Sequence, residues 1–335
     1  MGKKLEIVSV IGCGTWGGAV GQSLAKQGYS VKIWHKFEEE VNHLIKFRKH
    51  FILDDLIFED SIVFSSNYDD VIPGSDIIVI AVPSHIVRLI IPELASRANS
   101  NTIFVNLAKG IENDSLLTMS QVISSVGGIH KDKIVTLYGP SHAEEVAKNL
   151  PTTLVSASSS MESAEIVQRV FSNPLLRIYT NTDILGVELG GSLKNVIAIA
   201  AGICDGVGYG DNTKAALLTR GITEMTRLGV AMGAQKETFF GLSGIGDLIA
   251  TCLSKHSRNR FVGEAIGRGQ KIDEILAGMN MVAEGVKTAK SIHQLIEKYK
   301  VDMPISSAIY NVIFNEHNPI VAVQQLMTRE LVSEQ

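Results

Sequence analysis

A glycine-rich turn between a buried strand and a helix constrains the fold of this chain more than any other feature. The apolar run at residues 5–11 leads directly into the sequence GCGTWG, and a helix rich in small residues follows at 19–26. In this context Gly12 permits a tight turn, Gly14 lets the backbone approach a pyrophosphate, and Gly17 allows close packing of the helix. The first N–H groups of the helix would face the anion. The pattern therefore predicts a dinucleotide-binding unit.

The end of the second predicted strand bears on the choice of dinucleotide. Residues 29–34 form this strand, and His35 and Lys36 follow it. A unit that prefers NAD usually has Asp or Glu here to bond the ribose 2′-hydroxyl, whereas basic side chains suit a 2′-phosphate. His35 and Lys36 therefore favour NADP over NAD, unless they lie in an ordinary solvated loop. Three glutamates follow at 38–40, and one of them could reach the ribose if the strand ends later.

Further apolar runs define the architecture. The runs at 76–82, 102–107, 134–137 and 153–156 are continuous and separated by helical stretches. Strands of this kind belong to a sheet covered on both faces. Later in the chain the pattern is helical, with helices expected at 191–203, 214–228, 247–253, 259–267, 283–299 and 305–314. We predict an α/β fold: a Rossmann-type doubly wound sheet over 1–186, then an all-helical domain over 187–335, with the catalytic cleft between them.

Composition, charge and cysteine usage exclude several functional classes. With 335 residues, 45% of them apolar, the chain is long enough for two folded domains. Its net charge of -4 argues against nucleic-acid binding, and the basic clusters at 46–50 and 255–260 are too short to change this. Three cysteines without a C-x-x-C pair suggest a reducing cytoplasm rather than a disulfide framework. No signal peptide is recognisable, and the apolar run at 194–205 is far shorter than the ~20 residues that span a bilayer.

One lysine stands inside an apolar helical run. Lys194 follows Gly190 and Gly191 and precedes a stretch of Val, Ile and Ala residues. Burial disfavours an ammonium group and lowers its pKa from roughly 10.4, which would let the amine act as a base near neutral pH. The alternative is a lysine that extends its head into water from a core helix. The glycine turn near the other end of the chain favours the catalytic interpretation.

Turns that follow two of the strands carry polar groups suited to a site. Lys109 follows the strand at 102–107, and ligands of open parallel sheets bind at such carboxyl ends. Ser141 lies in the sequence GPSHAEE, between another strand and a helix. The alternatives are a surface lysine and an ordinary helix start with Pro and Glu in its first turn.

Two helix starts in the second half complete the set. Asp247 and Thr251 are four residues apart and therefore share a helical face, although Asp247 could also be only an N-terminal acid. Ser257, Arg258 and Asn259 combine free helical N–H groups with a guanidinium fork, which predicts a phosphate site. A capped helix with a solvated basic turn is the alternative.

Together these segments resemble one family, the bacterial-type NAD(P)-dependent glycerol-3-phosphate dehydrogenases. The matching segments are GCGTWGGA, AVPSHIVR, NLAKGIE, GPSHAEEVA, GVELGGSLKNVIAIAAGICDG, GDNTKAALLTRG, GLSGIGDLIATC, SRNRFVG and VAEGVKT. The resemblance implies reversible hydride transfer between NAD(P)H and dihydroxyacetone phosphate, which gives sn-glycerol 3-phosphate for phospholipid synthesis. It also implies a cytoplasmic homodimer.

The resemblance assigns roles to individual residues as well. It makes Lys194 the proton acceptor when the alcohol is oxidised. Contacts with the dinucleotide are expected from Thr15, Trp16, His35, Lys36, Lys109, Ala143, Arg258, Val282 and Glu284, beside Gly12, Gly14 and Gly17 of the turn. Contacts with the substrate are expected from Lys109, Gly139, Ser141, Lys194, Asp247, Ser257, Arg258 and Asn259. No metal is needed, because the hydride chemistry belongs to the nicotinamide.

The chain departs from the family pattern in three places. Thr15 stands where serine is more usual, His142 stands where phenylalanine is common, and residues 51–60 lack the expected Tyr-Leu-Pro-Gly loop. The last departure leaves the conformation of that loop open. Three other functions compete. A β-hydroxyacid or 6-phosphogluconate-type dehydrogenase would place a histidine and an asparagine differently around Lys194, and a non-enzymatic NADP sensor would not need Lys194, Asp247 and Arg258 together. The third is a nucleic-acid binder that would use the basic cluster at 255–260.

Overall fold

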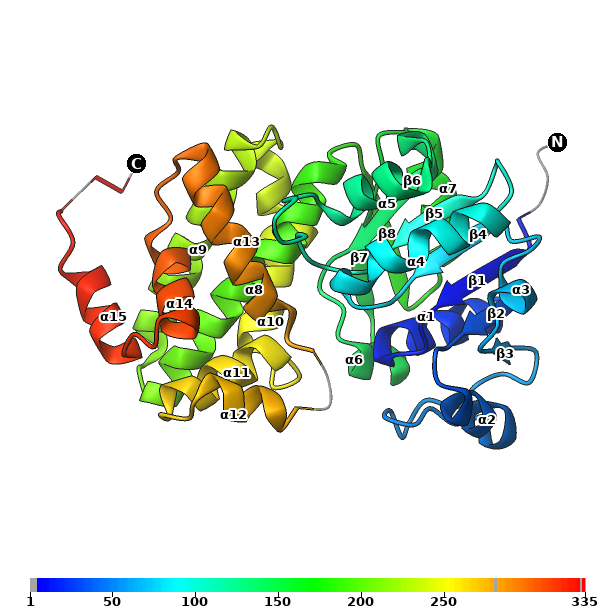
Figure 1. Cartoon of the computed structure of the whole chain (residues 1–335), viewed down its shortest axis with the longest axis horizontal. Coiled ribbons are helices and arrows are strands. Elements are labelled where there is room, and N and C mark those ends of the chain that lie inside the picture. Colours follow the sequence, from blue (N-terminus) through cyan, green and yellow to red (C-terminus); the bar gives the residue numbers. More distant parts are fainter. Residues whose placement is uncertain (1–4, 280–281, 332, 335) are drawn as a thin grey trace. The chain divides into compact units, whose positions relative to one another are not determined.

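The computed structural model describes residues 5–279, 282–331 and 333–334 (Figure 1). The described chain forms two compact units. The first comprises Met1–Lys109 and Leu117–Glu188, and the second comprises Gly110–Leu116 and Leu189–Gln335. The short segment after Lys109 therefore packs with the second unit, although first-unit residues flank it on both sides. The functional domain limits at 186 and 187 stay a prediction.

An eight-stranded sheet forms the centre of the first unit, in the order β3-β2-β1-β4-β5-β6-β7-β8. The strands are β1 (Ile7–Ile11), β2 (Ser30–Trp34), β3 (Val63–Ser65), β4 (Ile77–Ile80), β5 (Ile103–Asn106), β6 (Ile134–Tyr138), β7 (Thr152–Ala157) and β8 (Leu176–Asn181). Neighbouring strands are parallel except β6 and β7, which are antiparallel. The predicted doubly wound α/β sheet is confirmed.

Two strands, β3 and β8, were not predicted from the sequence. β3 is an edge strand of only three residues. β8 lies at the opposite edge, and its first four residues alternate between buried and exposed. Neither strand has the continuous apolar run that marks a strand buried on both faces.

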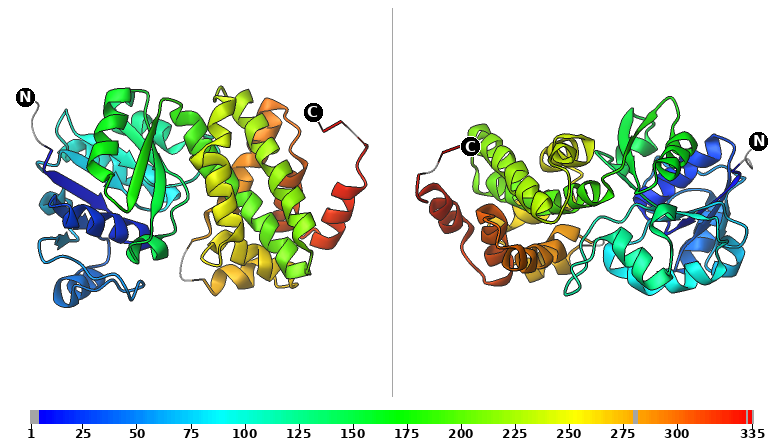
Figure 2. Two further views of the ribbon diagram at one scale, coloured as in Figure 1. Left: turned by 180° about the vertical axis from the view of Figure 1, so that it is seen from behind. Right: turned by 90° about the horizontal axis from the view of Figure 1, so that it is seen from above.

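Helices cover both faces of this sheet (Figures 1 and 2). One face packs against α1 (Thr15–Lys26), α2 (Glu38–Phe47), α6 (Ala143–Ala147) and α7 (Met161–Phe171), through a core that includes Val10, Leu24, Leu44 and Val167. The other face packs against α3 (Tyr68–Val71), α4 (Ser84–Arg97) and α5 (Met119–Gly127), through Ile78, Ile91 and Val122. Because β1 lies between β2 and β4, the strand order reverses direction at the carboxyl end of β1. Open α/β sheets bind their ligands at such a switch point.

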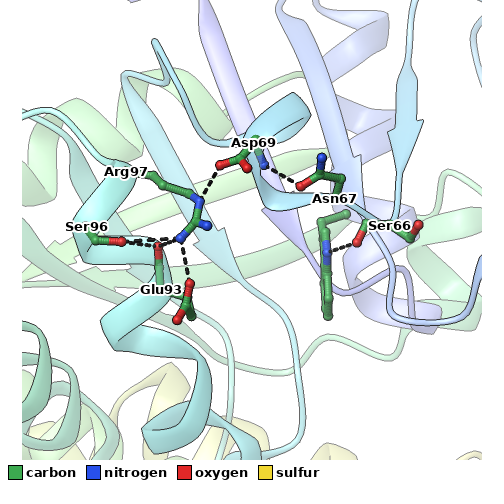
Figure 3. Close-up of polar contacts among 7 residues, drawn as sticks. Ser66, Asn67, Asp69, Glu93, Ser96 and Arg97 are labelled. Carbon is green, nitrogen blue, oxygen red and sulfur yellow. Dashed lines mark hydrogen bonds and ion pairs between the residues drawn. The ribbon is translucent and has the colours of Figure 1, made fainter.

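Arg97, in the last turn of α4, ties this helix to the short α3 (Figure 3). Its Nε donates to Asp69 Oδ1 at 2.6 Å, and its Nη1 donates to Glu93 Oε2 at 2.6 Å. Asn67 caps α3 by accepting a hydrogen bond from the Asp69 N–H at 3.0 Å. Arg97 thus bonds one residue of each helix, although exposed ion pairs of this kind contribute little to stability.

The second unit is helical. It contains most of α8 (Ile184–Val207), followed by α9 (Asp211–Ala231), α10 (Asp247–Leu253), α11 (Arg258–Gly267), α12 (Ile272–Ala277), α13 (Glu284–Tyr299), α14 (Pro304–Phe314) and α15 (Pro319–Met327). The described residues beyond β8 include no strand, and the predicted all-helical character is confirmed. The sequence did not predict α12 and α15.

The length expected for the apolar helix was wrong. α8 has 24 residues: it begins at Ile184, before Gly190, and ends at Val207, whereas the predicted helix covered only 191–203. By length and composition alone it could cross a membrane, but 89% of its most apolar window is buried inside the protein. A core helix of a folded domain has the same properties, and membrane insertion does not fit this packing.

Glycines allow α8 to approach α11 closely. A Cβ atom on Gly202 would lie 2.0 Å from the Arg260 carbonyl oxygen, and one on Gly263 would lie 1.9 Å from the Ile199 carbonyl oxygen. No side chain fits at either position, so the glycines determine how near the two backbones come. This contact supports the helix that carries Lys194.

Candidate active site

The glycine turn has the geometry that each of its glycines predicts. Gly12 has a φ of 108°, and a Cβ atom there would lie 2.6 Å from the Ala81 carbonyl oxygen. A Cβ atom on Gly17 would lie 2.0 Å from the Gly12 carbonyl oxygen, so this position packs the helix against the turn. At Gly14, in contrast, no heavy atom of the described residues lies within 4 Å of the Cβ position. The open space at the start of α1 fits a dinucleotide pyrophosphate.

His35 already has two partners at the end of β2. Its Nδ1 accepts a hydrogen bond from the Cys13 N–H at 3.2 Å, and its Nε2 pairs with Glu40. The side chain of His35 is 13% exposed, so the solvated-loop alternative does not describe it. Lys36 is exposed, with its Nζ 5.6 Å from the centroid of the Phe37 ring. A basic side chain and an acidic one, Glu40, therefore both flank this strand end.

Lys109, Gly139 and Ser141 come together in the first unit. The Lys109 Nζ donates to the Gly139 carbonyl oxygen at 3.1 Å, and the Ser141 Oγ donates to the same oxygen at 3.1 Å. Lys109 follows β5, whereas Gly139 and Ser141 follow β6, the next strand of the sheet. Ala143 begins α6 just beyond them and is buried. This group offers an ammonium and a hydroxyl at the carboxyl ends of two neighbouring strands.

Lys194 forms a buried polar cluster with α10. Its Nζ lies 2.5 Å from Asp247 Oδ1 and 2.5 Å from Thr251 Oγ1. The side chains of Lys194 and Asp247 are only 6% and 2% exposed. The alternative of a lysine that reaches bulk water is therefore wrong. A buried ammonium held by a carboxylate and a hydroxyl is typical of a group placed for chemistry rather than for solubility.

The start of α11 carries three predicted site residues, Ser257, Arg258 and Asn259. Their side chains differ in burial and in the hydrogen bonds they already make. Ser257 caps the helix, because its Oγ accepts from the Arg260 N–H at 3.2 Å. The Asn259 side chain is buried, donates to Asn195 Oδ1 at 3.0 Å and accepts from the Gly285 N–H at 2.9 Å.

The exposed Arg258 donates through Nη1 to the Val282 carbonyl oxygen at 3.1 Å. Glu284 begins α13 two residues after Val282. These contacts bring the predicted residues 258, 282 and 284 into one region of the second unit. No group of three His, Cys, Asp or Glu side chains that could hold a metal ion occurs in the described ranges.

Comparison with known proteins identifies the family. Residues 7–164 match the NAD-dependent glycerol-3-phosphate dehydrogenase N-terminus, and residues 183–324 match the corresponding C-terminus. This chain belongs to the NAD-dependent glycerol-3-phosphate dehydrogenase family.

Individual relatives of this dehydrogenase are similar over nearly their whole length. Glycerol-3-phosphate dehydrogenase (NAD(P)+) 2 of Salinibacter ruber is 48% identical over 324 residues, which cover 96% of this chain and 94% of the relative. The Chlorobium limicola enzyme is 47% identical over 326 residues, with coverage of 96% and 98%. The crystal structure of glycerol-3-phosphate dehydrogenase from Coxiella burnetii has a TM-score of 0.92 at 32% identity and covers 97% of this chain and 99% of that one.

The dehydrogenase also contains a supporting network that sequence reasoning missed. The buried Glu188 carboxylate accepts hydrogen bonds from the Ser120 N–H at 2.8 Å, the Ser120 Oγ at 2.6 Å and the Thr136 Oγ1 at 3.0 Å. Burial raises the pKa of the Glu188 carboxyl, and these hydrogen bonds partly oppose the shift. Asn106 Nδ2 donates to Glu188 Oε1 at 3.3 Å and to the Ala108 carbonyl oxygen at 3.2 Å.

The network reaches the backbone just before Lys109. The Ala108 N–H donates to Asn106 Oδ1 at 3.0 Å, and the Tyr138 hydroxyl also bonds the Ala108 carbonyl oxygen. Asn106 and Glu188 are 82 residues apart in the chain, so no local pattern predicts their contact. Their only sequence signal is polarity at positions that the strand and helix patterns would bury.

Proposed function

We propose that this protein is an NAD(P)-dependent sn-glycerol-3-phosphate dehydrogenase, which interconverts dihydroxyacetone phosphate and sn-glycerol 3-phosphate. The observation that carries the proposal is the buried Lys194–Asp247–Thr251 cluster, in a chain whose relatives of 47–48% identity bear this enzyme name. The nicotinamide, when bound, supplies or accepts the hydride. The protein then has to orient the ketone and handle the proton.

Lys194 is the residue we assign to the proton. Reduction of the ketone develops negative charge on the C2 oxygen, which an ammonium group stabilises and then protonates. In the reverse direction the free amine accepts this proton. Asp247 and Thr251 orient the Nζ atom, since each lies 2.5 Å from it. Lys109, held by the Gly139 carbonyl oxygen, is the second cation that we assign to the substrate.

The phosphate of the substrate is assigned to the start of α11. Ser257 and Asn259 already have protein partners for their side chains, whereas Arg258 is exposed and retains further N–H donors. A guanidinium binds phosphate through two parallel hydrogen bonds, and the first N–H groups of a ten-residue helix add to the attraction. Ser257 and Asn259 support the site through the cap and through Asn195.

The pyrophosphate of the dinucleotide is assigned to the glycine turn of the first unit, with NADP preferred and NAD also used. Gly12, Gly14, Gly17, Thr15 and Trp16 would surround the pyrophosphate at the start of α1, where the space at Gly14 is open. Lys36 supports a preference for the 2′-phosphate, and Glu40 opposes it. Ala143, Val282 and Glu284 keep their expected roles in binding the cofactor.

The cellular setting of the enzyme is the remaining part of the proposal. We place it in the cytoplasm as a homodimer that provides sn-glycerol 3-phosphate for phospholipid synthesis. All three cysteines are buried and free, which agrees with a reducing compartment. Sedimentation equilibrium at micromolar concentration tests the dimer, and a monomer there would contradict it.

The activity is tested by following the oxidation of NADPH and NADH separately. Dihydroxyacetone phosphate should support turnover with both, and faster at low concentrations of NADPH than of NADH. Unphosphorylated dihydroxyacetone is the matched control for the phosphate, and 6-phosphogluconate with NADP+ tests the competing dehydrogenase class. Turnover of 6-phosphogluconate without turnover of dihydroxyacetone phosphate would contradict the proposed function.

A further inference from the structure

Two histidines hold Cys13 inside the glycine turn. The Cys13 N–H donates to His35 Nδ1 at 3.2 Å, and His50 Nε2 lies 3.2 Å from the Cys13 carbonyl oxygen. Cys13 and His50 are buried, with exposed fractions of 0% and 2%. The backbone N–H and the backbone C=O of Cys13 are therefore each bonded to an imidazole ring from another segment of the chain.

The hydrogen bonds of His50 define its tautomer. Its Nδ1 accepts from the N–H groups of Ile52 and Leu53, each at 3.0 Å. A ring nitrogen that accepts hydrogen bonds carries no proton, so the proton of the neutral ring is on Nε2. His50 therefore donates to the Cys13 carbonyl oxygen. Burial lowers the pKa of His50, which also favours the neutral ring.

His50 immediately precedes residues 51–60, the stretch that lacks the expected Tyr-Leu-Pro-Gly sequence. The loop closes on itself, since the His50 N–H donates to the Leu56 carbonyl oxygen at 3.0 Å. It packs directly on α1: a Cβ atom on Gly18 would lie 2.9 Å from His50 Cδ2 and 3.3 Å from Leu56 Cδ2. The Phe51 ring stacks on His50, with centroids 4.5 Å apart. These contacts fix the imidazole against the turn.

The bond from His50 determines which way the next amide points. The peptide group between Cys13 and Gly14 is planar and trans, so its C=O and N–H point in opposite directions. With the Cys13 carbonyl held toward His50, the Gly14 N–H points away from the loop.

We propose that His50 is a positioning residue for the dinucleotide, which holds the Cys13–Gly14 peptide in the orientation that binds the pyrophosphate. The proposal rests on the proposed function, because it requires that the turn bind NADP or NAD. His50 itself does not touch the cofactor in this arrangement. Its effect on binding passes through the Cys13 carbonyl group.

Two substitutions separate the two nitrogens of the ring. In His50→Gln the side-chain amide can donate from near the position of Nε2, whereas in His50→Asn the amide oxygen can only replace Nδ1. The dissociation constant for NADPH, measured by fluorescence titration, should be about threefold to tenfold larger for His50→Asn than for His50→Gln, because only His50→Asn loses the bond to Cys13. His43→Asn, on the partly exposed α2, is the control and should bind NADPH like the wild type.

The outcomes discriminate between this proposal and the proposed function. If the wild type binds NADPH and the two His50 variants bind it equally, or His50→Asn binds it more tightly, His50 does not act through Cys13. A wild type that binds neither NADPH nor NADH would overturn both proposals. A further measurement needs no variant: NMR of the imidazole nitrogens in the wild type without ligand should place the His50 proton on Nε2. A proton on Nδ1 would overturn the positioning role even if both variants failed to fold.

Discussion

The ammonium group of Lys194 lies 2.5 Å from a carboxylate oxygen of Asp247, and neither side chain has appreciable access to water. α8 and α10 thus share one buried ion pair. Removing one partner of such a pair leaves the other charge buried and unpaired, which typically costs ~3–5 kcal/mol. Substitutions here therefore affect both stability and catalysis, and the two effects have to be separated.

Lys194→Ala should reduce kcat by about 10²–10⁴-fold, the usual contribution of a positioned acid or base. The dissociation constant for NADPH should hardly change, because the lysine acts on the C2 oxygen of the substrate. Lys194→Met combined with Asp247→Asn removes both charges and should recover most of the lost thermal stability without recovering turnover. A near-normal kcat in the single variant would exclude Lys194 as the proton donor and acceptor.

Arg258→Ala should raise the KM for dihydroxyacetone phosphate by about 10–100-fold, because a charge-assisted hydrogen bond to phosphate is lost. Unphosphorylated dihydroxyacetone never uses this bond and should be affected little. Lys255→Ala, three residues earlier and exposed, is the matched control. Equal losses with both ketones would mean that Arg258 acts through the cofactor or through the Val282 segment.

Glu40→Gln should improve kcat/KM for NADPH relative to NADH by about fivefold, since it removes a negative charge close to the proposed 2′-phosphate site. Glu38→Gln, also at the start of α2 but exposed, should change the ratio less.

His35→Asp should act in the opposite direction and raise the KM for NADPH far more than that for NADH, with the KM of the ketone unchanged. A wild type that strongly prefers NADH, or an unchanged ratio in the His35 variant, would contradict the assignment of His35 and Lys36 to the 2′-phosphate. Glu40 would then be the better candidate for a bond to the ribose.

Two glycines of the turn should respond differently to alanine. Gly17→Ala places a methyl group where the Gly12 carbonyl oxygen is only 2.0 Å away, so the unfolding free energy should fall by about 1–3 kcal/mol or more. Gly14→Ala meets open space and should keep the wild-type Tm, while it weakens NADPH and NADH binding together. A Gly14 variant that binds both dinucleotides normally would exclude the pyrophosphate from this position.

Glu224 should make stability depend on pH. The buried carboxylate on α9 accepts hydrogen bonds from the Ile305 N–H at 2.7 Å and from the Ser306 N–H at 3.0 Å, at the start of α14. Burial raises the pKa of the Glu224 carboxyl above its ordinary value of 4.5, and these bonds offset only part of the shift. The folded protein therefore holds this proton more tightly than the unfolded chain does.

The sign of the effect follows from proton linkage. As pH rises from about 4.5 through the raised pKa, the wild type should lose stability relative to Glu224→Gln, and the difference should then stay constant. Urea unfolding of both proteins between pH 4.5 and 8 measures it. A difference that is constant over the whole range would contradict the raised pKa.

Sequence patterns that are local predicted most of the fold. The strand, glycine turn and helix at the start of the chain follow from continuous apolar residues and from backbone freedom at Gly12, both of which act over a few residues. The strands predicted from continuous apolar runs and the helices predicted for the second half were also confirmed, because these patterns too are local. The edge strands β3 and β8 were missed because exposure on one side removes the apolar signal.

Only the tertiary structure decided which polar side chains meet. By itself the sequence determined that a lysine stands in an apolar helix. The partner of Lys194 is Asp247, which lies 53 residues later in the chain, and the partner of His50 is Cys13, which lies 37 residues earlier. Such pairs depend on how helices and loops pack against one another, which the spacing of residues along the chain does not specify. Only the folded structure therefore shows that Lys194 is buried. Only the folded structure also shows that the imidazole of His50 contacts the glycine turn.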